Sequence, residues 1–162
     1  MTFPLSRIAG SAVMTAVLLL SVQPGLARTA ADGSMPLSDV LRLVEANATR
    51  TVYSAEAHRS RWEVVSCEGR SRICREDVLD ANTGAVRTSE PDVVWSLPPR
   101  DALPASEIVA KIEEMDIGKI TEMDFDGGRW DIDIRRSFGS RAELKVDPLT
   151  GTIQRCEGRA CP

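Results

Sequence analysis

An internal repeat organises most of this 162-residue chain. Three motifs return in the same order: Pro-x-Ser-acid followed by apolar residues, Arg-Trp-acid-apolar, and Asp-x-x-Thr-Gly. They occupy residues 36–46 and 104–114, 61–64 and 129–132, and 80–84 and 147–151. Because order, spacing and residue type agree at three separate places, we predict that one structural unit occurs twice.

Each copy is predicted to begin with a helix, with Ser38 and Ser106 as N-cap residues and an apolar stripe that packs on a sheet. Strand-like runs follow, and in the second copy they fall at about 119–126, 129–136 and 141–147. The second of these runs alternates apolar and charged residues, which is typical of a sheet with one buried and one wet face. We predict an α+β fold of two repeats, each a helix packed on one face of a 3–4-stranded antiparallel sheet.

The N-terminal residues 1–27 have the pattern of a secretory signal peptide. Arg7 is followed by an apolar run from Ile8 to Val22, and the small residues Gly25 and Ala27 lie at positions −3 and −1 before the expected cleavage site. The run is shorter than a membrane-spanning helix needs, so a signal cleaved after Ala27 is favoured over a membrane anchor. We expect a periplasmic or secreted product that does not stay on the membrane.

The rest of the chain divides by composition and by the repeat. The expected units are a first repeat at 36–89, a proline-rich connector at 90–103, a second repeat at 104–156 and a C-terminal tail at 157–162. The formal net charge of −4 argues against a nucleic-acid partner, which would need a basic surface.

The four cysteines all lie beyond the signal segment, and an even count in an exported chain predicts two disulfides. A zinc site is disfavoured because the spacings are longer than the usual short ones. Keeping Trp62 and Leu79 on one sheet face places Cys67 opposite Cys74 in a hairpin. Of the three possible connectivities we therefore predict Cys67–Cys74 and, by default, Cys156–Cys161, both as structural links on short loops.

The helix that starts at a Ser-acid pair, the Trp-led strand and the Asp-x-x-Thr-Gly ending together resemble the PepSY domain, present twice. The second copy is the closer match, and the first departs from it by a cysteine pair and one extra residue. This resemblance implies an exported module for which a peptidase-inhibiting role has been proposed. It implies no shared catalytic residues.

No catalytic residue set, cofactor motif or metal-ligand spacing is evident in the sequence. His58 is the only histidine, and we expect it to be solvated near a turn before Trp62. A Gly127-Gly128 hairpin turn would place acids on neighbouring strands of the second copy, on the face away from the helix. These acids are Glu122, Asp124, Asp131, Asp133 and Glu143.

The acids have two functional interpretations beside that of a solvated surface partly neutralised by Lys145. They can form a docking surface for a basic protein partner, or a weak Ca²⁺ site of oxygen ligands. The first copy has Glu56, His58, Glu63 and Val65 at the matching places, so we expect such a role in the second copy only. We predict a non-catalytic binding module that inhibits or regulates a peptidase of the cell envelope. The alternative is an ion- or ligand-responsive accessory protein of the periplasm.

Overall fold

The computed structural model describes residues 33–46 and 50–161, so the predicted signal peptide at residues 1–27 lies outside the described part. The elements are α1 (Leu37–Glu45), β1 (Arg50–His58), β2 (Arg61–Glu68), β3 (Ile73–Asp80), β4 (Val86–Val93), α2 (Ala105–Glu114), β5 (Lys119–Asp126), β6 (Arg129–Arg135), the 3-10 turn η1 (Ser137–Gly139), β7 (Arg141–Val146) and β8 (Ile153–Gly158). Strand β4 thus continues into the segment expected as a connector. Neither of the described helices is long and apolar enough to cross a membrane.

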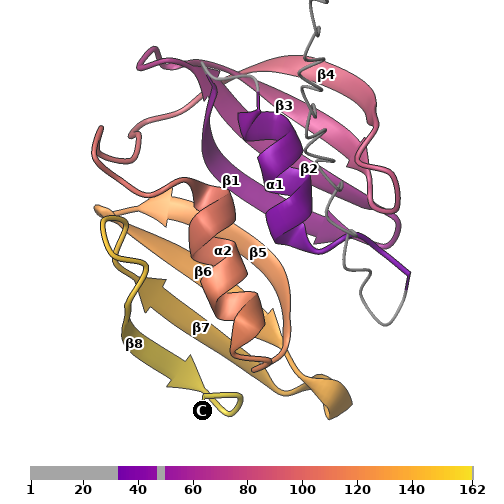
Figure 1. Ribbon diagram of the computed structural model, residues 1–162, viewed down its shortest axis with the longest axis vertical. Helices are drawn as coiled ribbons and strands as arrows, with labels where there is room; N and C mark the ends of the chain where they lie inside the picture. The colour runs from indigo at the N-terminus through magenta and orange to yellow at the C-terminus, as the bar shows by residue number, and fades with distance from the viewer. Residues whose placement is uncertain (1–32, 47–49, 162) are drawn as a thin grey trace, which may run out of the picture.

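All eight strands form one antiparallel sheet in the order β4-β3-β2-β1-β5-β6-β7-β8, with both helices on the same face (Figure 1). The predicted fold class of two repeats, each with its own 3–4-stranded sheet, was therefore wrong. The protein is mostly β, with two helices on a single sheet. The reason is the pairing of β1 with β5, which joins the edge strands that two separate sheets would have left open. An open edge exposes unpaired backbone N–H and C=O groups, and pairing two edges satisfies both.

The seam between β1 and β5 relates the two halves of the molecule. Ser54, Ala55 and Glu56 lie opposite Asp124, Met123 and Glu122. Ala55 and Met123 occupy equivalent positions of the sequence repeat, and the strands run in opposite directions around them. The halves are consequently related by an approximate two-fold axis through this pair.

The core lies between the two helices and the sheet. It contains the predicted apolar stripes of both helices and the inward residues of β2, β6 and β7. The fully or nearly fully buried members include Val40, Leu41, Val44, Ile108, Val109, Ile112, Trp62, Val64, Trp130, Ile132, Ile134, Leu144 and Val146. Burying each large side chain contributes about 1.5–3 kcal/mol, so this shared core accounts for much of the fold's stability.

The helix N-termini differ from the prediction. Ser38 and Ser106 are not N-cap residues, because each helix begins one residue earlier, after a proline. The backbone N–H and the hydroxyl of Ser38 donate to the carboxylate of Glu113, at the end of α2. In return, Glu45 at the end of α1 accepts from the backbone N–H groups of Ala105 and Ser106. Each helix therefore supplies the anion that the N-terminus of the other requires.

Both predicted disulfides are present. Cys67 and Cys74 lie directly opposite each other on β2 and β3, and Cys156 is joined to Cys161. The first disulfide lies on the sheet face away from the helices, in a small second apolar cluster with Val65 and Val94. The segment after β4 therefore packs on the helix-free face of the first half.

The Asp-x-x-Thr-Gly motif has a structural role in both copies. The side chain of Asp80 accepts hydrogen bonds from the backbone N–H groups of Asn82 and Thr83. Asp147 accepts from Leu149 and Thr150 in the same way. The Arg87 guanidinium and these N–H donors lower the pKa of Asp80 to about 2. The motif thus closes the last hairpin of each half.

Candidate binding site on the helix-free sheet face

The five acids predicted from the sequence lie together on the sheet face away from the helices. Glu122, Asp124, Asp131, Asp133 and Glu143 line one hollow with a volume of about 130 Å³, which we call the acidic hollow. The two-residue turn at Gly127-Gly128, where both glycines have positive φ, sets the predicted register of β5 and β6. The β5–β6 hairpin therefore brings the first four acids together, and the pairing of β6 with β7 adds Glu143.

Acids face each other across neighbouring strands of the hollow. Asp124 lies opposite Asp131, and Asp133 lies between Glu122 on β5 and Glu143 on β7. Like charges in directly opposed positions destabilise a sheet. The arrangement is therefore unfavourable for the folded protein unless a cation compensates it.

The acids continue beyond the hollow, which the sequence analysis missed. Glu56 on β1 lies opposite both Glu122 on β5 and Glu63 on β2, and Glu143 lies opposite Glu157 on β8. One carboxylate from each of six neighbouring strands thus forms a continuous line, which we call the acidic row. In sheet order its members are Glu63, Glu56, Glu122, Asp133, Glu143 and Glu157.

Acids of the first copy also reach this surface, although a binding role was expected for the second copy only. Two members of the acidic row, Glu56 and Glu63, come from the first copy. They align with the second copy only because β1 pairs with β5. The register of the β1–β2 hairpin could have shown that Glu56 and Glu63 face each other. The pairing of β1 with β5, which brings them beside the second copy, could not be predicted from the sequence.

Cations compensate only part of this surface. The ammonium group of Lys145 lies 2.7 Å from a carboxylate oxygen of Asp131 and also contacts Glu143. These hydrogen bonds raise the pKa of Lys145. In the described part of the chain, Glu122, Asp124 and Asp133 form no ion pair with a lysine or arginine. The centre of the acidic hollow therefore keeps a net negative charge, which Lys145 and Arg141 offset only in part.

The electrostatics of the hollow agree with this geometry. Burial and the carboxylate of Asp131 raise the pKa of Asp124 above its usual value. Burial and the carboxylate of Glu143 raise the pKa of Asp133. A raised pKa means that the folded state holds the proton more tightly than the unfolded state. The two groups therefore favour folding fully only below the ordinary value of 3.8, and this contribution is lost as the pH rises through the raised values.

Neutralising these two aspartates should stabilise the protein. At pH 7 we expect Asp124→Asn/Asp133→Asn to raise the free energy of unfolding by about 0.2–1 kcal/mol per position, because a repulsion between opposed acids is removed. The gain should vanish near pH 3, where the wild-type carboxyls are protonated as well. Urea unfolding at both pH values measures it. An equal gain at both would show that charge is not its cause.

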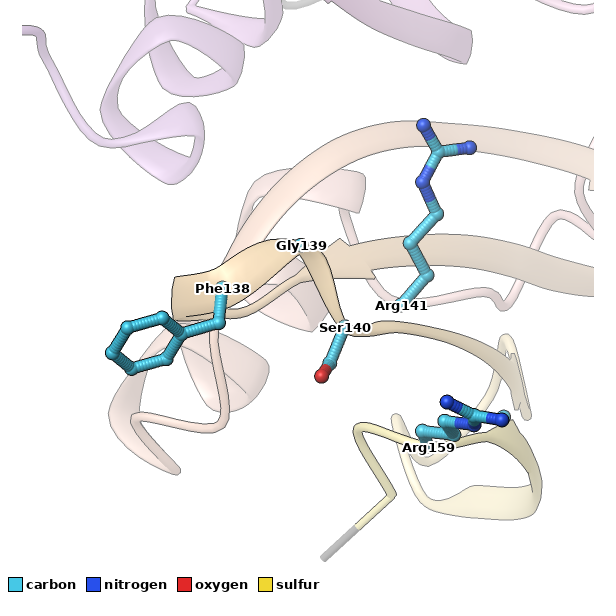
Figure 2. A pocket seen from close by; sticks show the side chains of 6 residues that line it. Phe138, Gly139, Ser140, Arg141 and Arg159 are labelled. Carbon is cyan, nitrogen blue, oxygen red and sulfur yellow. The ribbon is translucent and has the colours of Figure 1, made fainter.

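A larger hollow of about 450 Å³ lies at the end of the sheet, lined by Phe138, Gly139, Ser140, Arg141, Gly158 and Arg159. In Figure 2 the side chains of Phe138 and Arg141 point away from each other. Phe138 is fully exposed and has a positive φ of 65°. The lining groups do not converge on one point, so the acidic hollow is the better candidate site.

Comparison with known proteins bears on residues 95–157, which match the family model "Peptidase propeptide and YPEB domain". No curated protein matches the chain. Among solved structures, the chain is similar to a crystal structure described as that of a putative lipoprotein from Clostridium difficile 630. The two are 17% identical with a TM-score of 0.47, and the similarity covers 76% of this chain and 93% of the other. Residues 95–157 therefore match a family model of the PepSY type that the sequence of the second copy resembles.

Proposed function

We propose that this chain is an exported, non-catalytic binding module that regulates or inhibits a peptidase of the cell envelope. The acidic row and the acidic hollow hold a basic segment of that partner. The family match supports this class of function, because its description names peptidase propeptides. The signal-like N-terminal sequence supports export.

The observation that carries the proposal is the acidic row. Neighbouring strands lie about 4.8 Å apart, so a row across six strands spans roughly 24 Å, the length of about seven extended residues. At its centre, Glu122 and Asp133 lie opposite each other with no lysine or arginine ion pair in the described part of the chain. A bound cationic segment would offset this repulsion, which the free protein must bear.

The direct test is binding of a labelled peptide of alternating lysine and glycine, followed by fluorescence anisotropy. We expect binding that weakens as salt is added, because exposed charges are screened. Asp124→Asn/Asp133→Asn should weaken it about tenfold if each lost contact contributes about 0.7 kcal/mol. This variant is also expected to be more stable than the wild type, so unfolding could not explain the loss.

The matched control removes the same charge from the opposite side of the molecule. Glu107 and Glu114 are exposed on α2, and Glu107→Gln/Glu114→Gln should bind the lysine peptide as the wild type does. A peptide of alternating glutamate and glycine should not bind. Failure of the lysine peptide to bind, or equal weakening in both variants, would exclude the acidic surface as its site.

The partner class needs a second experiment. Immobilised wild-type protein and Asp124→Asn/Asp133→Asn are incubated with an extract of the cell envelope, and the retained proteins are identified and assayed for peptidase activity. A peptidase retained by the wild type only, and less active when bound, is the expected result. If both proteins retain the same partners, those partners do not bind through the acidic surface.

The alternative function, an ion- or ligand-responsive accessory protein of the periplasm, is favoured by one observation. The five carboxylates of the acidic hollow are the oxygen donors that Ca²⁺ prefers. Calorimetric titration with Ca²⁺ should then give heat, and the melting temperature should rise. Absence of both effects excludes the Ca²⁺ version of this function.

A further inference from the structure

Two glutamates and one histidine meet at the turn end of the β1–β2 hairpin. Glu56 and His58 are two residues apart on β1 and therefore on the same sheet face, and Glu63 lies opposite Glu56 on β2. His58 Nε2 is 3.0 Å from one carboxylate oxygen of Glu63 and 3.7 Å from one of Glu56. One ligand atom from each of the three lies within 4.8 Å of the others.

These separations suit a shared metal ion. Two ligands about 2.1 Å from a tetrahedral ion are about 3.4 Å apart, and the two observed distances from His58 bracket this value. Imidazole nitrogen and carboxylate oxygen are both ligands that Zn²⁺ accepts, and three protein ligands leave a fourth tetrahedral position open. The side chains of His58 and Glu56 are 34% and 55% exposed, so water can complete the coordination.

Arg61 and Glu122 are charged neighbours of these three side chains. Both Nε and a terminal nitrogen of Arg61 bind the other carboxylate oxygen of Glu63, which leaves its second oxygen directed at His58. Such contacts from outside a coordination sphere fix the orientation of ligands. On the other side, Glu122 lies opposite Glu56 and adds a further negative charge. A divalent cation would therefore enter a region of net negative charge.

The second copy provides an internal comparison. The repeat places Asp124, Asp126 and Asp131 at the positions of Glu56, His58 and Glu63. All three equivalents offer only oxygen, which suits Ca²⁺ and Mg²⁺, whereas imidazole selects transition metals. His58 is the only histidine of the chain, and all four cysteines are in disulfides. The first copy alone thus has a nitrogen donor among its acids.

We propose that Glu56, His58 and Glu63 bind one divalent transition-metal ion, with Zn²⁺ as the expected ion. Glu56 and Glu63 also belong to the acidic row, so this site overlaps one end of the surface assigned to the basic segment and lies outside the acidic hollow at its centre. His58 lies beside a turn, as expected, because it is the last residue of β1, but its proximity to Glu56 and Glu63 was not predicted. A turn of only Arg59 and Ser60 was the signal that could have placed His58 in the strand.

The test is titration of the purified protein, carrying no histidine tag, with Zn²⁺ alone. Calorimetry should show one ion per chain, and the single imidazole should give shifted nitrogen signals in ¹⁵N NMR spectra. His58→Gln should weaken Zn²⁺ binding at least about tenfold, because losing even a residue that only supports a ligand commonly weakens metal binding by about 10- to 100-fold. Its melting temperature without metal should match the wild type, because His58 is partly exposed at a strand end.

The matched control is Asp126→Asn, at the equivalent position of the second copy, which should bind Zn²⁺ as the wild type does. The proposal is overturned if Zn²⁺ causes neither heat nor a shift of the imidazole signals. It is also overturned if His58→Gln binds Zn²⁺ unchanged, because the ion would then occupy the carboxylates alone. The Asp124→Asn/Asp133→Asn variant should keep Zn²⁺ binding while binding the lysine peptide more weakly, so the two proposals can fail separately.

Discussion

The variant Trp130→Ala is expected to lose about 3–5 kcal/mol of unfolding free energy, the usual cost of deleting a buried tryptophan side chain. Trp130 is 1% exposed and belongs to the core between the sheet and the helices. Its ring meets that of Phe125 edge to face, with ring centroids 5.3 Å apart. A domain of this size is typically stable by only about 5–15 kcal/mol, so the loss should be conspicuous. Urea unfolding followed by circular dichroism measures it.

The variant Trp130→Phe distinguishes the contribution of side-chain volume to stability from that of the indole N–H group. The indole nitrogen of Trp130 is buried and has no hydrogen-bond partner in the described part of the chain. Leaving such a donor unpaired costs about 1–3 kcal/mol, and phenylalanine removes the donor while keeping much of the ring. We therefore expect Trp130→Phe to lose much less stability than Trp130→Ala. Equal losses would contradict the assignment of the effect to lost volume.

The variant Asp77→Ala is expected to cost about 3–5 kcal/mol for a different reason. Asp77 is 2% exposed and lies on the helix-facing side of β3, opposite Val64. A terminal nitrogen of Arg50 donates to it at 2.8 Å, and the hydroxyl of Ser89 donates to its other oxygen. Removing the carboxylate leaves the largely buried Arg50 charge without this partner. The same urea unfolding measurement applies.

The control for this prediction replaces both charges together. Arg50→Met/Asp77→Leu removes the ion pair as a unit, and such replacements are often neutral or stabilising. We expect the double variant to be clearly more stable than Asp77→Ala. If Asp77→Ala instead lowers the free energy of unfolding by less than about 1 kcal/mol, the prediction is wrong. The Arg50 guanidinium would then be hydrated by water in the absence of Asp77.

The two sheet faces of this protein therefore have opposite energetic roles. The helix-facing side holds the shared core and the Arg50–Asp77 pair, where substitutions should be costly. The other face holds the acidic row, where neutralisation of Asp124 and Asp133 should be favourable. A surface whose native charges reduce stability is typical of a binding site, because the ligand supplies the missing compensation.

Much of each half followed from local patterns. Alternation along β6 placed Trp130 in the core, and the Gly127-Gly128 turn set which acids of β5 and β6 face each other. The extra residue of the first copy set the opposition of Cys67 and Cys74. Such features are readable because side chains alternate along a strand and a short turn fixes the pairing of its flanking strands.

The repeated unit, the hairpin registers, both disulfides and the cluster of five acids could be read from the order of the residues. Three features became visible only in the folded molecule: the pairing of β1 with β5, the binding of Glu45 and Glu113 to the opposite helix ends, and the extension of the acids into the first half by Glu56. They were not predictable because edge strands pair through backbone groups, which are nearly the same in every residue. Side-chain patterns therefore say which face of a strand is buried, and they do not say which edges meet.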